Sequence, residues 1–129
     1  MKSINNYINE KLVISKKLKK YQYTCQPKDK GELKEIIKDR LEADKDANLN
    51  DIDVSQITDM SDLFVGLDPH NIDISEWDVY NVIDMLYMFD GCENFNCDLS
   101  KWDVSNVIAM SGMFYGCKSL KNKPSWYKE

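Results

Sequence analysis

A stretch of 16 residues occurs twice in this chain, with the two copies 25 residues apart. The first copy, WDVYNVIDMLYMFDGC, spans 77–92, and the second, WDVSNVIAMSGMFYGC, spans 102–117. A more divergent copy begins at Asp53 and keeps Val54, Met60 and Phe64. A fixed period in this range is typical of repeat proteins, in which each unit packs mainly against its two neighbours. The period therefore constrains the fold more than any local pattern does.

Two local patterns recur inside each repeat. Apolar residues alternate with polar ones over 70–74 and over 95–99, which predicts short strands. Equivalent strands would pair in parallel at about 4.8 Å. A second set has the spacing of a short α- or 3₁₀-helix with an inward apolar face, namely Val82, Met85, Met88 and Phe89, then Val107, Met110, Met113 and Phe114. One coil is therefore predicted to be strand, turn, short helix and turn.

The part of the chain before the repeats predicts a cap. The alternation over 21–25 favours a strand, and Asp29 followed by Glu32 favours the start of a helix that runs to about Ala43. We therefore expect an N-terminal cap over 1–48, made of a strand and an amphipathic helix. A repeat solenoid over 49–129 would follow, closed at its end by Pro124, which cannot donate to a further strand.

Composition and charge restrict the location and the partners. The chain of 129 residues suits one domain and has no apolar run long enough to span a membrane. Its first residues lack the apolar core of a secretory signal, so we expect a cytoplasmic protein whose four cysteines are thiols. Residues 1–41 carry a net +6 and residues 42–129 a net −11. The acidic part could contact a basic partner or imitate a nucleic acid, and the same charges could equally be solvated faces.

The repeat also resembles a known family. Leu99 to Met110, followed by Met113, Phe114, Gly116 and Cys117, is similar to the repeat L-S-x-W-D-V-S-N-V-T-x-M-x-x-M-F-x-G-C of the BspA-type leucine-rich-repeat family, once catalogued as a mycoplasma protein of unknown function. The resemblance covers about 49–126 and departs from the pattern at Ile57, Thr58, Leu63, Tyr80 and Leu86. It implies a right-handed leucine-rich-repeat-like solenoid of α/β class, with about three coils and a role in protein–protein interaction. The opening over 6–12 resembles phage-encoded, signal-less members.

The residues that could carry chemistry favour structural roles. The repeated Met, Trp and Asp positions are interpreted as packing and as turns, and Gln56, Asn81 and Asn106 as inward amides that satisfy the backbone of the coils. A zinc site would need His70, Cys92, Cys97 and Cys117 to converge, whereas equivalent repeat positions stack in a row. We therefore expect no catalytic residues, no metal and no cofactor, and a protein that is not an enzyme.

The outward face of the predicted strands remains as the candidate site. Its residues would be Asn71, Asp73, Ser75, Asn96, Asp98 and Ser100. The first hypothesis is a non-enzymatic module that binds a protein, such as a host bacterial protein, through this sheet face and its acidic rim. The second is a phage- or mobile-element-encoded inhibitor whose acidic segment imitates nucleic acid in a basic groove, and the third is a zinc-dependent enzyme. Self-association could extend the face, and direct binding to nucleic acid or membrane is not expected.

Overall fold

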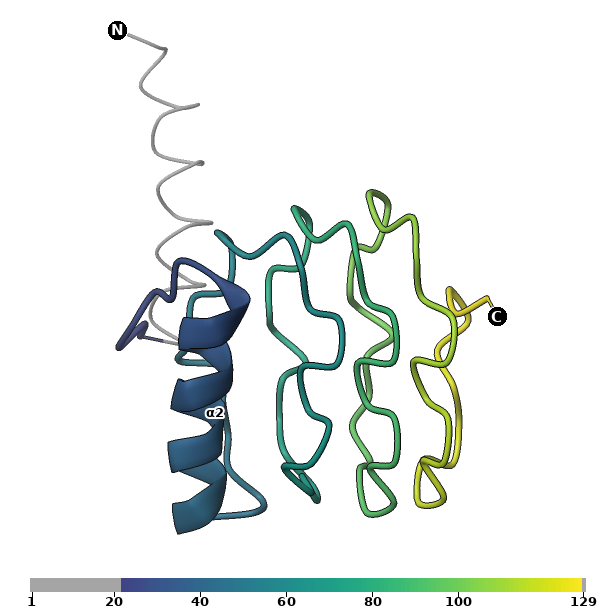
Figure 1. Cartoon of the computed structure of the whole chain (residues 1–129), viewed down its shortest axis with the longest axis horizontal. Helices are drawn as coiled ribbons and strands as arrows, with labels where there is room; N and C mark the ends of the chain where they lie inside the picture. Colours follow the sequence, from purple (N-terminus) through teal and green to yellow (C-terminus); the bar gives the residue numbers. More distant parts are fainter. Residues whose placement is uncertain (1–21, 129) are drawn as a thin grey trace, which may run out of the picture.

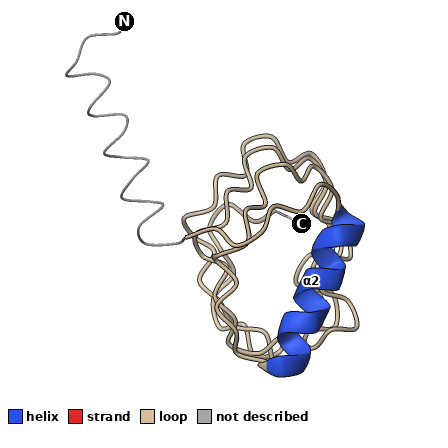
Figure 2. Cartoon of the chain, turned by 90° about the vertical axis from the view of Figure 1, so that its left-hand side faces the viewer, coloured by secondary structure: helices blue, strands red, loops and turns tan. Residues whose placement is uncertain are grey.

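The computed structural model describes residues 22–128. One helix, α2 (Lys30–Ala43), lies at the N-terminal end of this range, and the chain after it forms a stack of coils that runs toward the C-terminus (Figure 1). Seen from the helix end, the coils superimpose as one ring, with α2 lying against one side (Figure 2). The cap strand expected over 21–25 is not formed within the described residues, where Cys25 makes a single bridge to Ile52.

Helix α2 is present where Asp29 and Glu32 predicted it. The Asp29 carboxylate accepts the Glu32 N–H at 2.9 Å, and Glu32 in turn accepts the Lys28 N–H at 3.1 Å, which forms a capping box. Leu33, Ile37 and Leu41 are buried against the coils. The helix is also fastened by Lys34, whose Nζ donates to the carbonyls of Asp62 and Val65 at 3.1 and 3.2 Å. The helix therefore covers backbone groups of the first coil as well as its apolar core.

Residues 25 positions apart lie beside each other in the stack. Parallel bridges join Asn48 to Asp73, Asp59 to Asp84 and Asp84 to Ala109. Between these bridges, backbone hydrogen bonds of 2.8–2.9 Å repeat from coil to coil, as from Met60 N to Asp84 O, from Met85 N to Ala109 O, from Phe64 N to Met88 O and from Phe89 N to Met113 O. The period seen in the sequence is therefore the interval at which the coils stack.

The predicted fold class, a leucine-rich-repeat-like α/β solenoid built on a sheet, is wrong. Within residues 22–128 there is one helix, and the pairing between coils consists of isolated bridges rather than strands of a sheet. The segments 70–74 and 95–99 are not strands, and the segments that begin at Val82 and Val107 each consist of an isolated bridge followed by turns rather than a short helix. The division into a cap over 1–48 and a repeat unit over 49–129 stays a prediction.

Aspartates explain why the alternating segments do not extend into strands. Asp53, Asp73, Asp78, Asp98 and Asp103 each accept the backbone N–H two residues later, at 2.9–3.1 Å. An Asx turn of this kind bends the chain and uses an N–H that a strand would need for pairing. The aspartates therefore make corners in the coils, and each straight segment is too short to be more than a bridge.

Aromatic rows fill the inside of the stack. Phe64, Phe89 and Phe114 stack along one row, with ring centroids 4.9 Å and 5.7 Å apart. Trp77, Trp102 and Trp126 form another row, at 6.3 Å and 6.2 Å. The Nε1 atoms of the three tryptophans donate at 2.9 Å to the carbonyls of Leu49, Ile74 and Leu99. The rows therefore join the coils by ring contact and by hydrogen bonds.

Substitution of Gly112 by alanine tests one corner of the third coil. Gly112 has φ +67°, and the equivalent Asp62 and Tyr87 also have positive φ. A Cβ at Gly112 would lie 2.3 Å from the Tyr87 ring, which is half-exposed and can turn away. We expect Gly112→Ala to lower the free energy of unfolding by about 1–2 kcal/mol, the cost of the left-handed conformation. Urea unfolding followed by circular dichroism measures this change.

The control for this substitution is Gly31→Ala. Gly31 lies in α2 and has ordinary contacts around its missing Cβ. Alanine is there expected to raise the free energy of unfolding by about 0.5–1 kcal/mol. Effects of opposite sign at the two glycines are the expected pattern, and a stabilising Gly112→Ala would contradict the assigned backbone conformation.

Candidate binding groove

The six residues predicted to bind a partner do not form a sheet face. Asn71, Asn96, Asp98 and Ser100 are exposed, whereas Asp73 and Ser75 are partly buried. The Asp73 carboxylate accepts the Ser75 N–H at 3.0 Å and the Ser75 hydroxyl at 2.6 Å. Burial would raise the pKa of Asp73, but the hydrogen bonds from Ser75 outweigh it, and the pKa is lowered. Asp98 accepts the Ser100 N–H in the same way, so both aspartates of the predicted face hold turns.

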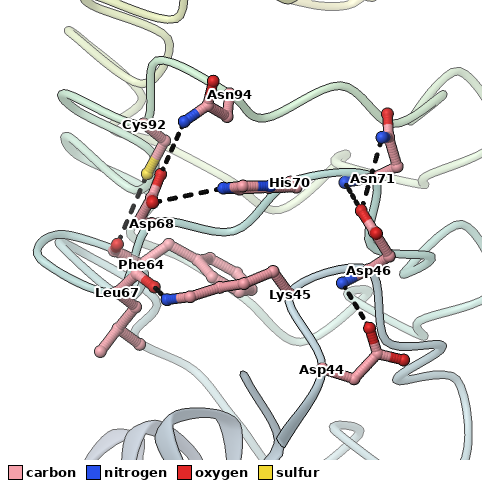
Figure 3. Close-up of polar contacts among 10 residues, drawn as sticks. All are labelled: Asp44, Lys45, Asp46, Phe64, Leu67, Asp68, His70, Asn71, Cys92 and Asn94. Atoms are coloured by element: carbon pink, nitrogen blue, oxygen red, sulfur yellow. Dashed lines mark hydrogen bonds and ion pairs between the residues drawn. The ribbon is translucent and has the colours of Figure 1, made fainter. Parts of the chain in front are cut away.

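Three of these six residues do share a hollow. Asn96, Asp98 and Ser100 line a depression of about 540 Å³ together with Cys97, Lys121 and Asn122. Asn71 lies in the preceding coil, where its backbone N–H and its Nδ2 both donate to Asp46, at 3.0 and 3.4 Å (Figure 3). The structure thus brings half of the predicted set together, and its role in binding stays a prediction.

The residues considered for zinc have other partners. His70 Nε2 lies 3.3 Å from Asp68, which also accepts from Asn94 at 3.1 Å, whereas the Cys92 thiol donates to the Phe64 carbonyl at 3.4 Å (Figure 3). The hydrogen bond from Asn94 and then that from His70 lower the pKa of Asp68. Across residues 22–128, no group of three or more His, Cys, Asp or Glu side chains is placed to hold a metal ion.

Three thiols are held in their protonated form by the fold. Burial is the main cause that raises the pKa of Cys92 to about 12 and those of Cys97 and Cys117 to about 11. The thiolate is the reactive form of cysteine, so these groups are poor nucleophiles near neutral pH. The equivalent Cys92 and Cys117 each donate to a backbone carbonyl of the preceding coil, that of Phe64 and that of Phe89. Their contacts are those of packing residues.

A groove on another side of the coils is the most distinctive surface feature. It has a volume of about 540 Å³ and crosses three coils, and it is lined by Ser55, Gln56, Thr58, Asn81, Ile83, Asn106 and Ile108. Ile83 is 45% exposed and Ile108 is 84% exposed. Their backbone N–H groups donate to Thr58 O and Ile83 O at 2.8 and 2.9 Å. The backbone therefore fixes a row of branched side chains, which we call the isoleucine row: Thr58, Ile83 and Ile108.

Beside the isoleucine row lies a row of amides, Gln56, Asn81 and Asn106. Asn81 Nδ2 donates to Ser55 O at 2.9 Å, and Asn106 Nδ2 donates to Tyr80 O at 2.8 Å. The expectation that these amides satisfy the backbone of the coils is met at both asparagines, but all three side chains are exposed rather than inside. In the described residues, no hydrogen bond uses the Oδ1 atom of either asparagine, which leaves that atom to accept from a ligand.

The groove can supply contact and hydrogen bonding, and its lining suggests no reaction. None of its seven lining residues is charged or has a side chain that titrates near neutral pH, so the lining provides no general acid or base. The sequence analysis did not predict this groove, because the predicted strands placed the exposed face over 70–75 and 95–100. The usable signal was that Ile83 lies between two residues of the predicted inward set, Val82 and Met85, and recurs as Ile108 between Val107 and Met110.

Comparisons with known proteins identify the repeat. In residues 22–128, no helix is long and apolar enough to cross a membrane. Searches of curated proteins and of solved structures gave no significant match. A family model described as "Mycoplasma protein of unknown function, DUF285" matches residues 32–128, which is most of the chain. From this match and the stacked 25-residue units, the chain belongs to the DUF285 family of BspA-like repeat proteins.

Proposed function

We propose that this protein is a non-enzymatic module that binds another protein through the groove. The observation that supports the proposal is the exposure of Ile83 and Ile108, at 45% and 84%, in a row fixed by backbone hydrogen bonds. Single exposed apolar residues are common on protein surfaces. Two aligned isoleucines beside a row of amides form a continuous surface with an apolar strip and polar neighbours, which is the composition of a small interface core.

Rigidity also favours binding at the groove. The isoleucine row lies on the coil segment where bridges join Asp59, Asp84 and Ala109, and Asn81 and Asn106 are tied to the preceding coil. A preorganised surface loses little conformational freedom when a partner docks, so more of the contact energy contributes to affinity. Tyr80, which is 51% exposed, follows the acidic residue Asp78 in the same coil and could extend the contact.

The proposal replaces the sheet face with the groove but keeps the expected kind of partner. We propose a host bacterial protein as the partner and the cytoplasm of a bacterial or phage-infected cell as the location. The phage-like origin rests on the resemblance of residues 6–12 alone. Imitation of nucleic acid by the acidic repeats is the second candidate, supported by the net −11 of residues 42–129.

A pull-down from bacterial lysate with three forms of the full chain tests the proposal. The first is wild type, the second is Ile83→Ser with Ile108→Ser, and the third is Tyr115→Ser. Tyr115 is 74% exposed and does not line the groove, so its variant controls for loss of exposed apolar surface. We expect a protein that wild type and the tyrosine variant retain and the isoleucine variant loses. The repurified protein should then bind the isoleucine variant at least about 10-fold more weakly, which corresponds to about 1.4 kcal/mol.

Two results would oppose the proposal. One is equal capture by all three forms, which would place the contact outside the groove. The other is the absence of any captured protein that depends on the isoleucines. Urea unfolding of each form checks that the serine substitutions leave the fold intact, as expected for side chains outside the buried core.

A further inference from the structure

We propose that the groove receives an amphipathic helix of the partner, with its apolar stripe on the isoleucine row and lysine or arginine side chains toward an acidic row at the groove's edge. This inference rests on the proposed function and names the chemistry of the partner segment. The acidic row consists of Asp53, Asp78 and Asp103, at equivalent positions in three coils. Three observations carry the inference: the position of the acidic row, the absence of cations in the groove, and the spacing of the coils.

Of the acidic row, Asp53 borders the groove through Ser55. The Asp53 carboxylate accepts the Ser55 N–H at 3.0 Å, and Ser55 lines the groove and accepts from Asn81. The same two-residue turn joins Asp78 to Tyr80 and Asp103 to Ser105, at 3.1 and 3.0 Å. The order acidic row, amide row and isoleucine row is therefore repeated in each coil. The aspartates do not line the groove itself, and Asp78 and Asp103 line a neighbouring hollow, so long cationic side chains of a docked segment would reach them across the amide row.

Within residues 22–128, no ion pair neutralises the acidic row, although Lys101, which pairs with Glu76, lines a hollow together with Asp78 and Asp103. The ion pairs of the described residues join Lys30 to Asp59, Arg40 to Asp51, His70 to Asp68, Lys101 to Glu76 and Lys118 to Glu93, and none involves Asp53, Asp78 or Asp103. The field of the row also reaches its neighbours: burial, then the charges of Asp53 and Asp78, raise the pKa of Tyr23. With an uncharged groove beside it, the row attracts a cationic segment and repels an acidic one.

The spacing of the coils favours a helix over an extended strand as the occupant. Bridged segments lie about 4.8 Å apart, so Thr58, Ile83 and Ile108 present side chains at this interval. Successive turns of an α-helix are about 5.4 Å apart, and residues at i, i+3, i+4 and i+7 share one face. In an extended strand, side chains on one face repeat at about 6.8 Å, which falls out of step after one coil. A helix thus places about one turn on each coil.

Binding of three designed peptides to the full chain, measured by fluorescence anisotropy, tests the inference. The first peptide is a helix with leucine at i, i+3, i+4 and i+7 and lysines beside that stripe. The second has glutamate in place of each lysine, and the third has a central proline that breaks the helix. We expect the lysine helix to bind at least about 10-fold more tightly than either of the others. Its affinity should also fall when salt is raised from about 0.05 M to about 0.5 M, since salt screens exposed charges.

Asp78→Asn with Asp103→Asn removes the charge but keeps the turns, because an asparagine side chain can accept the same backbone N–H. This variant should bind the lysine helix about 10-fold more weakly, as two exposed charge pairs are lost. Glu35→Gln with Asp39→Asn is the matched control, since both residues are exposed on α2 and the change in net charge is the same. The control variant should bind like wild type.

The outcomes separate the inference from the proposed function. The inference is wrong if the lysine helix does not bind wild type. It is also wrong if the lysine helix binds the Asp→Asn variant as tightly as wild type and wild type binds the glutamate helix as tightly as the lysine helix. A partner captured through Ile83 and Ile108 would still support the groove in that case. If instead the peptide binds and the serine variant of the isoleucines has no effect on it, both the inference and the assignment of the groove are wrong.

Discussion

Phe89→Ala is expected to lower the free energy of unfolding by about 3–5 kcal/mol. Phe89 is fully buried, and its ring stacks on Phe64, Phe95 and Phe114 with centroids 4.9, 4.1 and 5.7 Å away. The substitution leaves a cavity at the centre of the stack, where coils on both sides lose contacts. A loss of this size is a large part of the stability of a small domain, so partial unfolding at room temperature is a real outcome. Urea unfolding followed by circular dichroism measures it.

Phe114→Ala provides a graded comparison in the same row. Phe114 is 3% exposed and contacts Trp126 and Tyr127 on its outer side, with a tilted and an edge-on ring. Fewer rings stack in parallel on Phe114 than on Phe89, so Phe114→Ala should lower the free energy of unfolding by less than Phe89→Ala does. Tyr115→Ala, at a position 74% exposed, should change stability by less than about 0.5 kcal/mol. Equal losses at Phe89 and Tyr115 would show that the core does not lie along the phenylalanine row.

Trp102→Ala has the second-largest expected effect, again about 3–5 kcal/mol. Trp102 is 4% exposed, lies between Trp77 and Trp126 at 6.3 and 6.2 Å, and donates to Ile74 O at 2.9 Å. The substitution removes both the ring contacts and the hydrogen bond between coils. Loss of near-ultraviolet circular dichroism should accompany the lowered urea midpoint.

Trp102→Phe separates these two contributions. A phenyl ring keeps much of the stacking but cannot donate to Ile74 O, which retains only the Trp77 N–H at 3.2 Å. One lost hydrogen bond contributes about 1 kcal/mol, so the free energy of unfolding should lie between those of wild type and Trp102→Ala. A phenylalanine variant as unstable as the alanine variant would mean that the hydrogen bond, rather than ring packing, dominates at this position.

The sequence predicted the repeat unit and its packing better than it predicted the secondary structure. The shift of 25 residues became the stacking interval, and Asp29 and Glu32 located the start of α2. The prediction of strands over 70–74 and 95–99 was wrong because alternation shows only which side chains are buried. Buried and exposed side chains can alternate along a bent coil as well as along a strand. Asp53, Asp78 and Asp103 were correctly interpreted as turn residues. Asp73 and Asp98, which bend these two segments in the same way, had been assigned to the binding face instead.

The candidate site was less predictable because it depends on which coil segment faces solvent. The outward direction of Ile83 follows from the inward direction of Val82 and Met85, which the sequence did show. The choice among several exposed rows does not follow from the repeat, because every coil position generates a row. The repeat pattern gives the outward direction of Ile108, but its exposure of 84% is set by how the folded coils surround it.

The amide and isoleucine rows give the groove a length that is counted in repeats. Each coil contributes one amide and one branched residue, and each contacts only the coils before and after it. Duplication of one 25-residue unit would therefore lengthen the groove by a single step of about 4.8 Å without changing its lateral order of side chains. If the proposed binding holds, repeat number would set the length of partner segment that the groove accepts.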